Sequence, residues 1–263
     1  VLRGAFRVGA DFSWEPDLVS GADVVSRSPF TVVYRIRPAA RWSDGVPITA
    51  QDFVFTQRPL RDHGDPGEVH RTQIRSVRAR GAKTVEVTFR SLLSGWRDFF
   101  PNVLPAHALR GEDFATVWSS RIHNPKTGRP IASGPFLLPD WERGRELRYV
   151  RNPRYWGPHP AYLDRIVLRL ALSRAADQIE RLRSGELDLV QSIVLGGEDV
   201  QQLRGIRELE VEVRRAPTWE HFGIRQGEGG NPLLRRKLVR RALVYGMSRA
   251  AIARQLYGDI DAR

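Results

Sequence analysis

The sequence predicts a mixed α/β fold, with an antiparallel α+β part first and an α/β part after it. Two observations carry this prediction. Between residues 29 and 151, short β-branched and aromatic runs alternate with glycine and proline turns, which is typical of antiparallel strands. From about residue 157, longer apolar runs alternate with helical patterns, which favours a strand–helix–strand order. We therefore place an antiparallel subdomain at residues 1–156 and an α/β subdomain at residues 157–263.

The first strong strand signal is the β-branched and aromatic run at residues 31–36. Pro38 ends this strand, because proline has no N–H to donate to a sheet. The sequence Trp-Ser-Asp-Gly at residues 42–45 predicts a turn. Thr49 is then a suitable N-cap for a helix, and Asp52 lies near the positive end of that helix.

Two hairpins are predicted further along the antiparallel part. The runs 74–80 and 84–89 are short strand patterns that meet at Gly81, and they form the first hairpin. The runs 134–138 and 146–150 face each other across the Arg-Gly turn at 143–144 and form the second.

Two other segments are less regular. Trp-Glu-Pro-Asp at residues 14–17 predicts a turn, and the region before it is weakly patterned. Residues 96–109 look helical, although Pro101 and Pro105 interrupt the pattern.

The α/β part begins with an apolar strand at residues 166–170, of the type that is buried on both faces. A helix at 175–184 and a second strand at 187–190 follow, so the three elements predict a βαβ unit. The remaining predicted elements are strands at 209–214 and 220–224 and helices at 232–247 and 249–256.

The composition excludes some functions and weakens others. The chain has no cysteine, which excludes disulfides, thiolate metal sites and a cysteine nucleophile. Its net charge is +12, yet 39 of the 42 basic residues are arginines spread along the whole chain. This skew indicates a GC-rich, actinobacterial-like genome better than a nucleic-acid surface, so no nucleic-acid partner is predicted. The six histidines are scattered without metal-ligand spacing, and no catalytic constellation stands out, so we predict no metal, no cofactor and no enzymatic activity.

Several ordered blocks resemble the signature of family-5 extracellular solute-binding proteins, which serve ABC importers for oligopeptides, dipeptides, nickel and some sugars. The blocks keep the order and spacing of the family over about 230 residues. They lie at 34–38, 42–56, 133–136, 151–166, 184–188 and 239–258.

The resemblance implies a periplasmic-binding-protein-like class II fold, in which two lobes close over a ligand. It further implies that this chain is a first-lobe fragment, that the second lobe is missing and that the chain ends near the hinge. The expected partners are a peptide or other small solute and ABC permease subunits. The full-length protein is expected to be an extracytoplasmic monomer, held at the membrane by a lipid anchor outside this fragment.

The resemblance also implies which residues contact the ligand. In the family, a strand just after the βαβ part carries side chains into the cleft, and here that strand holds Trp219 and His221. Members usually have tyrosines on this strand, so the departure leaves the ligand class open. The other candidates are Asn102 in an expected cleft-facing loop, Trp96 on the helical run before it, and Ser133 at a strand end.

Two functions follow. The first is a substrate-binding component of an ABC importer that captures peptides or similar small solutes by lobe closure and delivers them to a permease. The alternative is a cell-envelope lipoprotein of the same fold with a regulatory or scaffolding role and no transport. The arginine richness and the altered strand at 219–225 leave room for this alternative.

Overall fold

The fold is described from a computed structural model, which covers residues 1–63, 73–170, 174–191, 195–214 and 221–258. The chain forms two compact units, Val1–Ala171 and Leu172–Arg263. The predicted division into subdomains at residue 157 remains a prediction.

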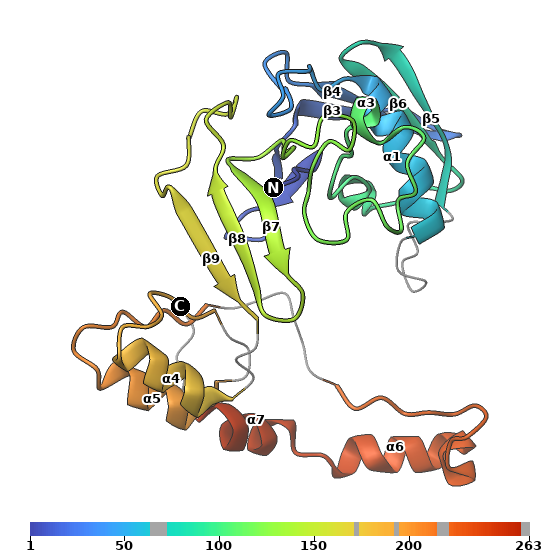
Figure 1. The fold of residues 1–263 in the computed structure, drawn as a ribbon. Coiled ribbons are helices and arrows are strands. Elements are labelled where there is room, and N and C mark those ends of the chain that lie inside the picture. Colours follow the sequence, from blue (N-terminus) through green and yellow to red (C-terminus); the bar gives the residue numbers. More distant parts are fainter. Residues whose placement is uncertain (64–72, 171–173, 192–194, 215–220, 259–263) are drawn as a thin grey trace. The chain divides into compact units, whose positions relative to one another are not determined.

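The first unit is built on a four-stranded antiparallel sheet (Figure 1). Its spatial order is β3–β4–β6–β5, and β4 and β6 are the central strands. The elements are β3 (Val19–Arg27), β4 (Phe30–Ile36), β5 (Ile74–Gly81) and β6 (Thr84–Phe89). These bounds confirm the predicted strand at 31–36 and the predicted hairpin at Gly81. A small hairpin of β1 (Phe6–Val8) and β2 (Trp14–Pro16) precedes the sheet.

Helix α1 (Ala50–His63) packs against β5 and β6, and an aromatic core fills the space between sheet and helix. Tyr34, Phe53 and Phe100 are among the largest fully buried side chains of this core. The predicted N-cap is confirmed. The Thr49 hydroxyl accepts from the Gln51 amide at 3.3 Å, and the Asp52 carboxylate accepts from the Thr49 amide at 2.7 Å.

A second antiparallel sheet completes the unit, with the order β7–β8–β9. It contains β7 (Phe136–Glu142), β8 (Glu146–Arg151) and β9 (Arg165–Arg169). The predicted hairpin between β7 and β8 is confirmed. Two short helical turns, η1 (Trp96–Asp98) and α3 (Ala106–Leu109), lie between the two sheets in the sequence.

Two predictions in this unit were wrong. Residues 14–16 are a strand and not a turn, because they pair with β1. Residues 96–109 do not form one helix, and only η1 and α3 are helical. Pro101 and Pro105 each remove a backbone donor and clash with the preceding turn, which confines helical geometry to the two ends of this run.

The predicted βαβ unit is not formed in the described residues. β9 pairs antiparallel with β8, and residues 187–190, 209–214 and 221–224 are not strands. β9 is also not buried on both faces, since Val167 is 42% and Leu168 46% exposed. The apolar pattern favours an extended backbone, but a strand also requires a neighbouring strand to accept its hydrogen bonds. The described part of the second unit provides none.

The second unit is helical in its described residues (Figure 1). It contains α4 (Ala175–Arg183), α5 (Gly197–Arg204), η2 (Pro232–Arg235), α6 (Lys237–Gly246) and α7 (Arg249–Tyr257). Ser248 caps α7, since its hydroxyl accepts from the Ala251 amide at 3.4 Å. The predicted helices at 175–184 and 249–256 are confirmed, and the one predicted at 232–247 is divided into η2 and α6.

Candidate functional site around the N-terminal segment

We call the first six residues the N-terminal segment, and one side of it is hydrogen-bonded to the residues just before β7. The Arg3 amide donates to the Ser133 hydroxyl at 2.8 Å. The Val1 carbonyl accepts from the amides of Ser133 at 3.2 Å and Gly134 at 2.8 Å. Ser133 itself is fully buried. Its hydroxyl and amide therefore fix the backbone and are not open to a ligand in this structure.

The other side of the N-terminal segment is bonded to the loop that follows η1. The Ala5 amide donates to the Phe100 carbonyl at 2.8 Å, and the Val103 amide donates to the Arg3 carbonyl at 3.0 Å. A Cβ atom at Gly4 would lie 2.5 Å from the Phe100 carbonyl oxygen, so this close approach requires glycine. Asn102 lies in the same loop and is exposed.

Trp96 packs against the end of the N-terminal segment. Its side chain is only 6% exposed, and its ring centroid lies 5.8 Å from those of Phe6 and Tyr34 in edge-to-face geometry. The Tyr34 hydroxyl donates to the Trp96 carbonyl at 2.9 Å. Burial strongly raises the pKa of the Tyr34 phenol, so this hydroxyl stays protonated and remains a donor. The structure thus places Trp96 mainly in the core.

Three of the five candidate residues therefore meet along the N-terminal segment: Ser133 at one side, Asn102 at the other and Trp96 at its end. Trp219 lies outside the described residues. His221 is exposed and belongs to the second compact unit.

The sequence reasoning missed the charged and aromatic residues that hold the segment in place. Arg3 forms an ion pair with Asp17, which is only 7% exposed. The Arg3 guanidinium carbon also lies 5.6 Å from the centre of the Tyr155 ring and 6.0 Å from that of Trp156. The Trp156 indole N–H donates to the Ser133 carbonyl at 3.0 Å. Trp156 could have been considered from the sequence, because residues 151–157 belong to one of the blocks that resemble the family.

Two carboxylates lie nearby in the fold and have opposite pKa shifts. Burial raises the pKa of Asp52 and outweighs the hydrogen bonds from the amides of Thr49 and Ala106. Burial would also raise the pKa of Asp44. Hydrogen bonds from His107, at 2.7 Å, and from the Val46 amide outweigh that effect and lower it. Both carboxylates tie loops together, and their opposite shifts predict opposite effects of pH on stability.

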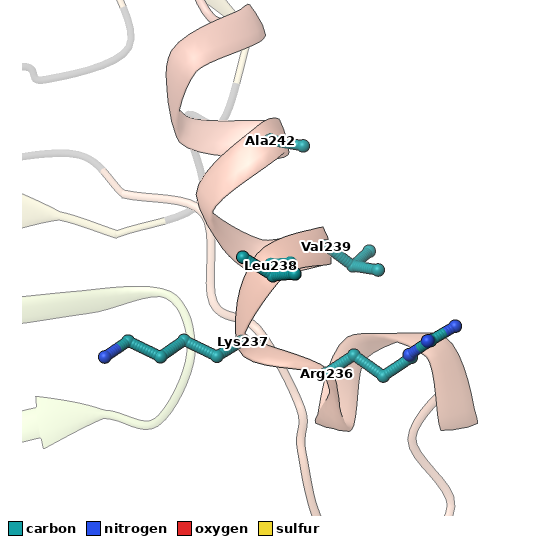
Figure 2. Close-up of a pocket in the computed structure, with 5 residues that line it drawn as sticks. All are labelled: Arg236, Lys237, Leu238, Val239 and Ala242. Atoms are coloured by element: carbon teal, nitrogen blue, oxygen red, sulfur yellow. The ribbon is translucent and has the colours of Figure 1, made fainter.

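A shallow hollow on α6 is open to solvent (Figure 2). All of its lining residues come from η2's end and the first turns of α6: Arg236, Lys237, Leu238, Val239 and Ala242. The side chains of Arg236 and Lys237 extend in opposite directions and do not converge on one point. The hollow therefore has no set of convergent polar groups such as a small-molecule site requires.

The described residues contain no group of three or more histidine, cysteine, aspartate or glutamate side chains that could hold a metal ion. None of the helices described here is long and apolar enough to cross a lipid bilayer.

Two curated relatives illustrate the similarity in sequence. Over 204 residues, the chain is 34% identical to the probable monoacyl phosphatidylinositol tetramannoside-binding protein LpqW of Mycobacterium tuberculosis. That alignment covers 73% of this chain and 31% of the relative. It is 30% identical to the oligopeptide-binding protein OppA of Mycobacterium bovis, over 96% of this chain and 42% of the relative. The chain thus spans less than half the length of these two relatives.

Two solved structures illustrate the similarity in fold. NikZ from Campylobacter jejuni in complex with Ni(L-His) has a TM-score of 0.73 at 19% identity. The oligopeptide-binding protein AppA from Bacillus subtilis in complex with a nonapeptide has a TM-score of 0.73 at 20% identity. Both alignments cover 97% of this chain and 49% of the other. These matches confirm the predicted fold class.

The sequence profile of one family matches almost the whole chain. Its description is bacterial extracellular solute-binding proteins, family 5 Middle, and the match covers residues 13–262. All the blocks that suggested the resemblance lie within this range. The chain therefore belongs to family 5 of the bacterial extracellular solute-binding proteins.

Proposed function

We propose that this chain is the first-lobe part of the substrate-binding component of an ABC importer, which captures peptides or similar small solutes and delivers them to a membrane permease. The family match over residues 13–262 is the observation that carries this proposal. The fold shared with AppA, which was solved with a nonapeptide, supports a peptide as the ligand. The description of the family as extracellular supports an extracytoplasmic location. A lipid anchor outside this chain is part of the proposal.

In this proposal the ligand lies between two lobes, and a hinge motion closes them over it. An extended peptide would be held largely by its backbone hydrogen bonds, which give affinity with little side-chain selectivity. Trp219, His221 and Asn102 are the proposed contacts. Ser133 and Trp96 are buried here, so we propose that they act by fixing the N-terminal segment and the loop that carries Asn102.

The test is mass spectrometry of ligands that co-purify with the full-length protein under native conditions. Recovery of peptides that disappear after unfolding and refolding would support the proposal. Repeated recovery of no solute, from a protein that is folded by circular dichroism, would contradict it.

A second candidate function is binding of an anionic glycolipid in the cell envelope, with a regulatory role and no transport. The 34% identity to a protein named for binding a monoacyl phosphatidylinositol tetramannoside favours it. The net charge of +12 suits a phosphate-bearing headgroup. The same purification distinguishes the two candidates if its organic extract is analysed separately. A phosphoglycolipid in that fraction, with no peptide in the aqueous one, would favour the second candidate.

A further inference from the structure

Arg97 is held against an aromatic cluster at the surface of the first unit. Its guanidinium carbon lies 4.2 Å from the centre of the Trp96 ring and 6.0 Å from that of Phe6. Both distances are in the range of cation–π contacts. Trp96 and Phe6 are buried, and the edge-to-face contacts of both rings with Tyr34 fix the support on which Arg97 lies.

The hydrogen-bond donors of Arg97 have no protein acceptor in the described part of the chain. Its contacts there are the two ring contacts. Arg3 provides a useful contrast, because it also lies over aromatic rings but is paired with Asp17. Arg97 is thus a half-buried residue whose guanidinium donors are used by no acceptor in the described fold.

A stacked guanidinium keeps its planar edge directed away from the ring. That edge offers N–H donors in a fork that matches both oxygens of a carboxylate. The aromatic support removes water from one face and restricts the rotamers of the long side chain, so less side-chain freedom is lost when an anion binds.

We propose that Arg97, supported by Trp96 and Phe6, is a binding site for the carboxylate group of a small solute. The site lies in the first unit alone and needs no residue of a second lobe. The proposal is also independent of peptide transport, because this site could bind a carboxylate in a protein that carries no peptide.

The experiment uses succinate as the probe and its neutral diamide, succinamide, as the matched ligand. Titrations of ¹⁵N-arginine-labelled protein would be followed by the Nε–Hε signal of Arg97, which is assigned by its loss in Arg97→Gln. We expect succinate to shift this signal until it saturates and succinamide to leave it in place. Dissociation constants from calorimetry at low ionic strength give the affinities, because salt screens such a contact.

Three variants test the assignment. Arg97→Gln should weaken succinate binding by about tenfold or more, since a charge-assisted bidentate contact is lost. Arg97→Lys should bind succinate with an affinity between those of the wild type and Arg97→Gln, because an ammonium keeps the charge but not the planar fork. Arg110→Gln removes the charge of another exposed arginine of the same unit and should change affinity less than about twofold, as expected for a surface charge. Circular dichroism and thermal unfolding check that each variant folds.

The proposal is overturned if succinate and succinamide bind alike, or if Arg97→Gln keeps the affinity of the wild type. Equal losses in Arg97→Gln and Arg110→Gln would also overturn it, because they would show attraction by net charge only. Failure to recover peptides from the full-length protein would leave this result unchanged, so the two proposals fail separately.

Discussion

Asp52 offers the sharpest test of how the first unit is held together. One carboxylate oxygen accepts from the Thr49 amide at 2.7 Å and caps α1, and the other accepts from the Ala106 amide at 2.9 Å. Helix α1 is thereby tied to α3, more than fifty residues further along the chain. Asp52→Ala leaves the buried Ala106 N–H without an acceptor and removes the cap. Each loss costs about 1–2 kcal/mol, and removal of a buried charge offsets part of it, so we expect about 2–3 kcal/mol in all.

The assay is urea unfolding followed by tryptophan fluorescence, compared at constant slope. Asp52→Asn keeps the shape and one acceptor oxygen, so it should cost about half as much as alanine. Glu112→Ala is the matched control, because Glu112 is an exposed carboxylate of the same unit and should change stability by less than about 0.5 kcal/mol. A loss below about 0.5 kcal/mol for Asp52→Ala would refute the reasoning, since it would mean that neither hydrogen bond matters to the fold.

The direction of the pKa shift adds a pH test of the same residue. Burial raises the pKa of Asp52 above its ordinary value of 3.8, so the folded state binds this proton more tightly than the unfolded state. The contribution of Asp52 to stability is therefore fully present below 3.8 and falls as pH rises through the raised folded pKa. The advantage of wild type over Asp52→Asn should grow on acidification through that window. A constant advantage would contradict the burial of this charge.

Three further predictions concern other contacts, and the same urea titration measures each. The hydrogen bonds that lower the pKa of Asp44 stabilise the fold at pH values above 3.8, the ordinary pKa of an aspartate. The loss of stability caused by Asp44→Asn should therefore shrink as pH falls below 3.8, and a larger loss at low pH would contradict this reasoning. Arg3→Ala leaves the buried Asp17 charge unpaired and should lower the free energy of unfolding by about 3 kcal/mol. Adding Asp17→Asn to this variant should recover part of the loss, and no recovery would mean that the pair is unimportant. Tyr34→Phe keeps the ring but leaves the Trp96 carbonyl without its donor, so a loss of about 1 kcal/mol is expected, and no loss would mean that water replaces the hydroxyl.

Local patterns predicted the antiparallel hairpins of the first unit well. The pairs β5–β6 and β7–β8 each join neighbouring strands across a short glycine-containing turn, so the information lies within about fifteen consecutive residues. The hairpin of β1 and β2 was missed because each strand has only three residues, and three residues carry too little alternation to be told from a loop.

The second unit shows where such patterns stop being sufficient. In residues 187–190, Leu-Asp-Leu-Val, a polar residue lies between apolar ones as in a half-buried strand. A strand is stabilised, however, by hydrogen bonds to a neighbour that need not be close in sequence. In the described residues of this unit no strand is available as that neighbour. The helices α4 and α7 were predicted because a helix satisfies its own backbone hydrogen bonds, whatever else the fold contains.

The sequence likewise predicted some residues of the candidate site and missed others. Ser133 was found because it belongs to a recognisable block, whereas its partner Arg3 lies 130 residues away and leaves no periodic signal. Ser133 and Trp96 are buried supports, and Asn102 and Arg97 are the accessible groups that these supports position.

A ligand surface in this unit is therefore better sought on the loop and helical turn held by the N-terminal segment than at the buried residues that the resemblance emphasised. The Arg3 carbonyl and the Ala5 amide fix the loop that carries Asn102, and Phe6 supports the aromatic cluster under Arg97. A change in the segment should consequently affect both accessible groups together, Arg97 through its contact with Phe6 and Asn102 through the backbone hydrogen bonds of its loop.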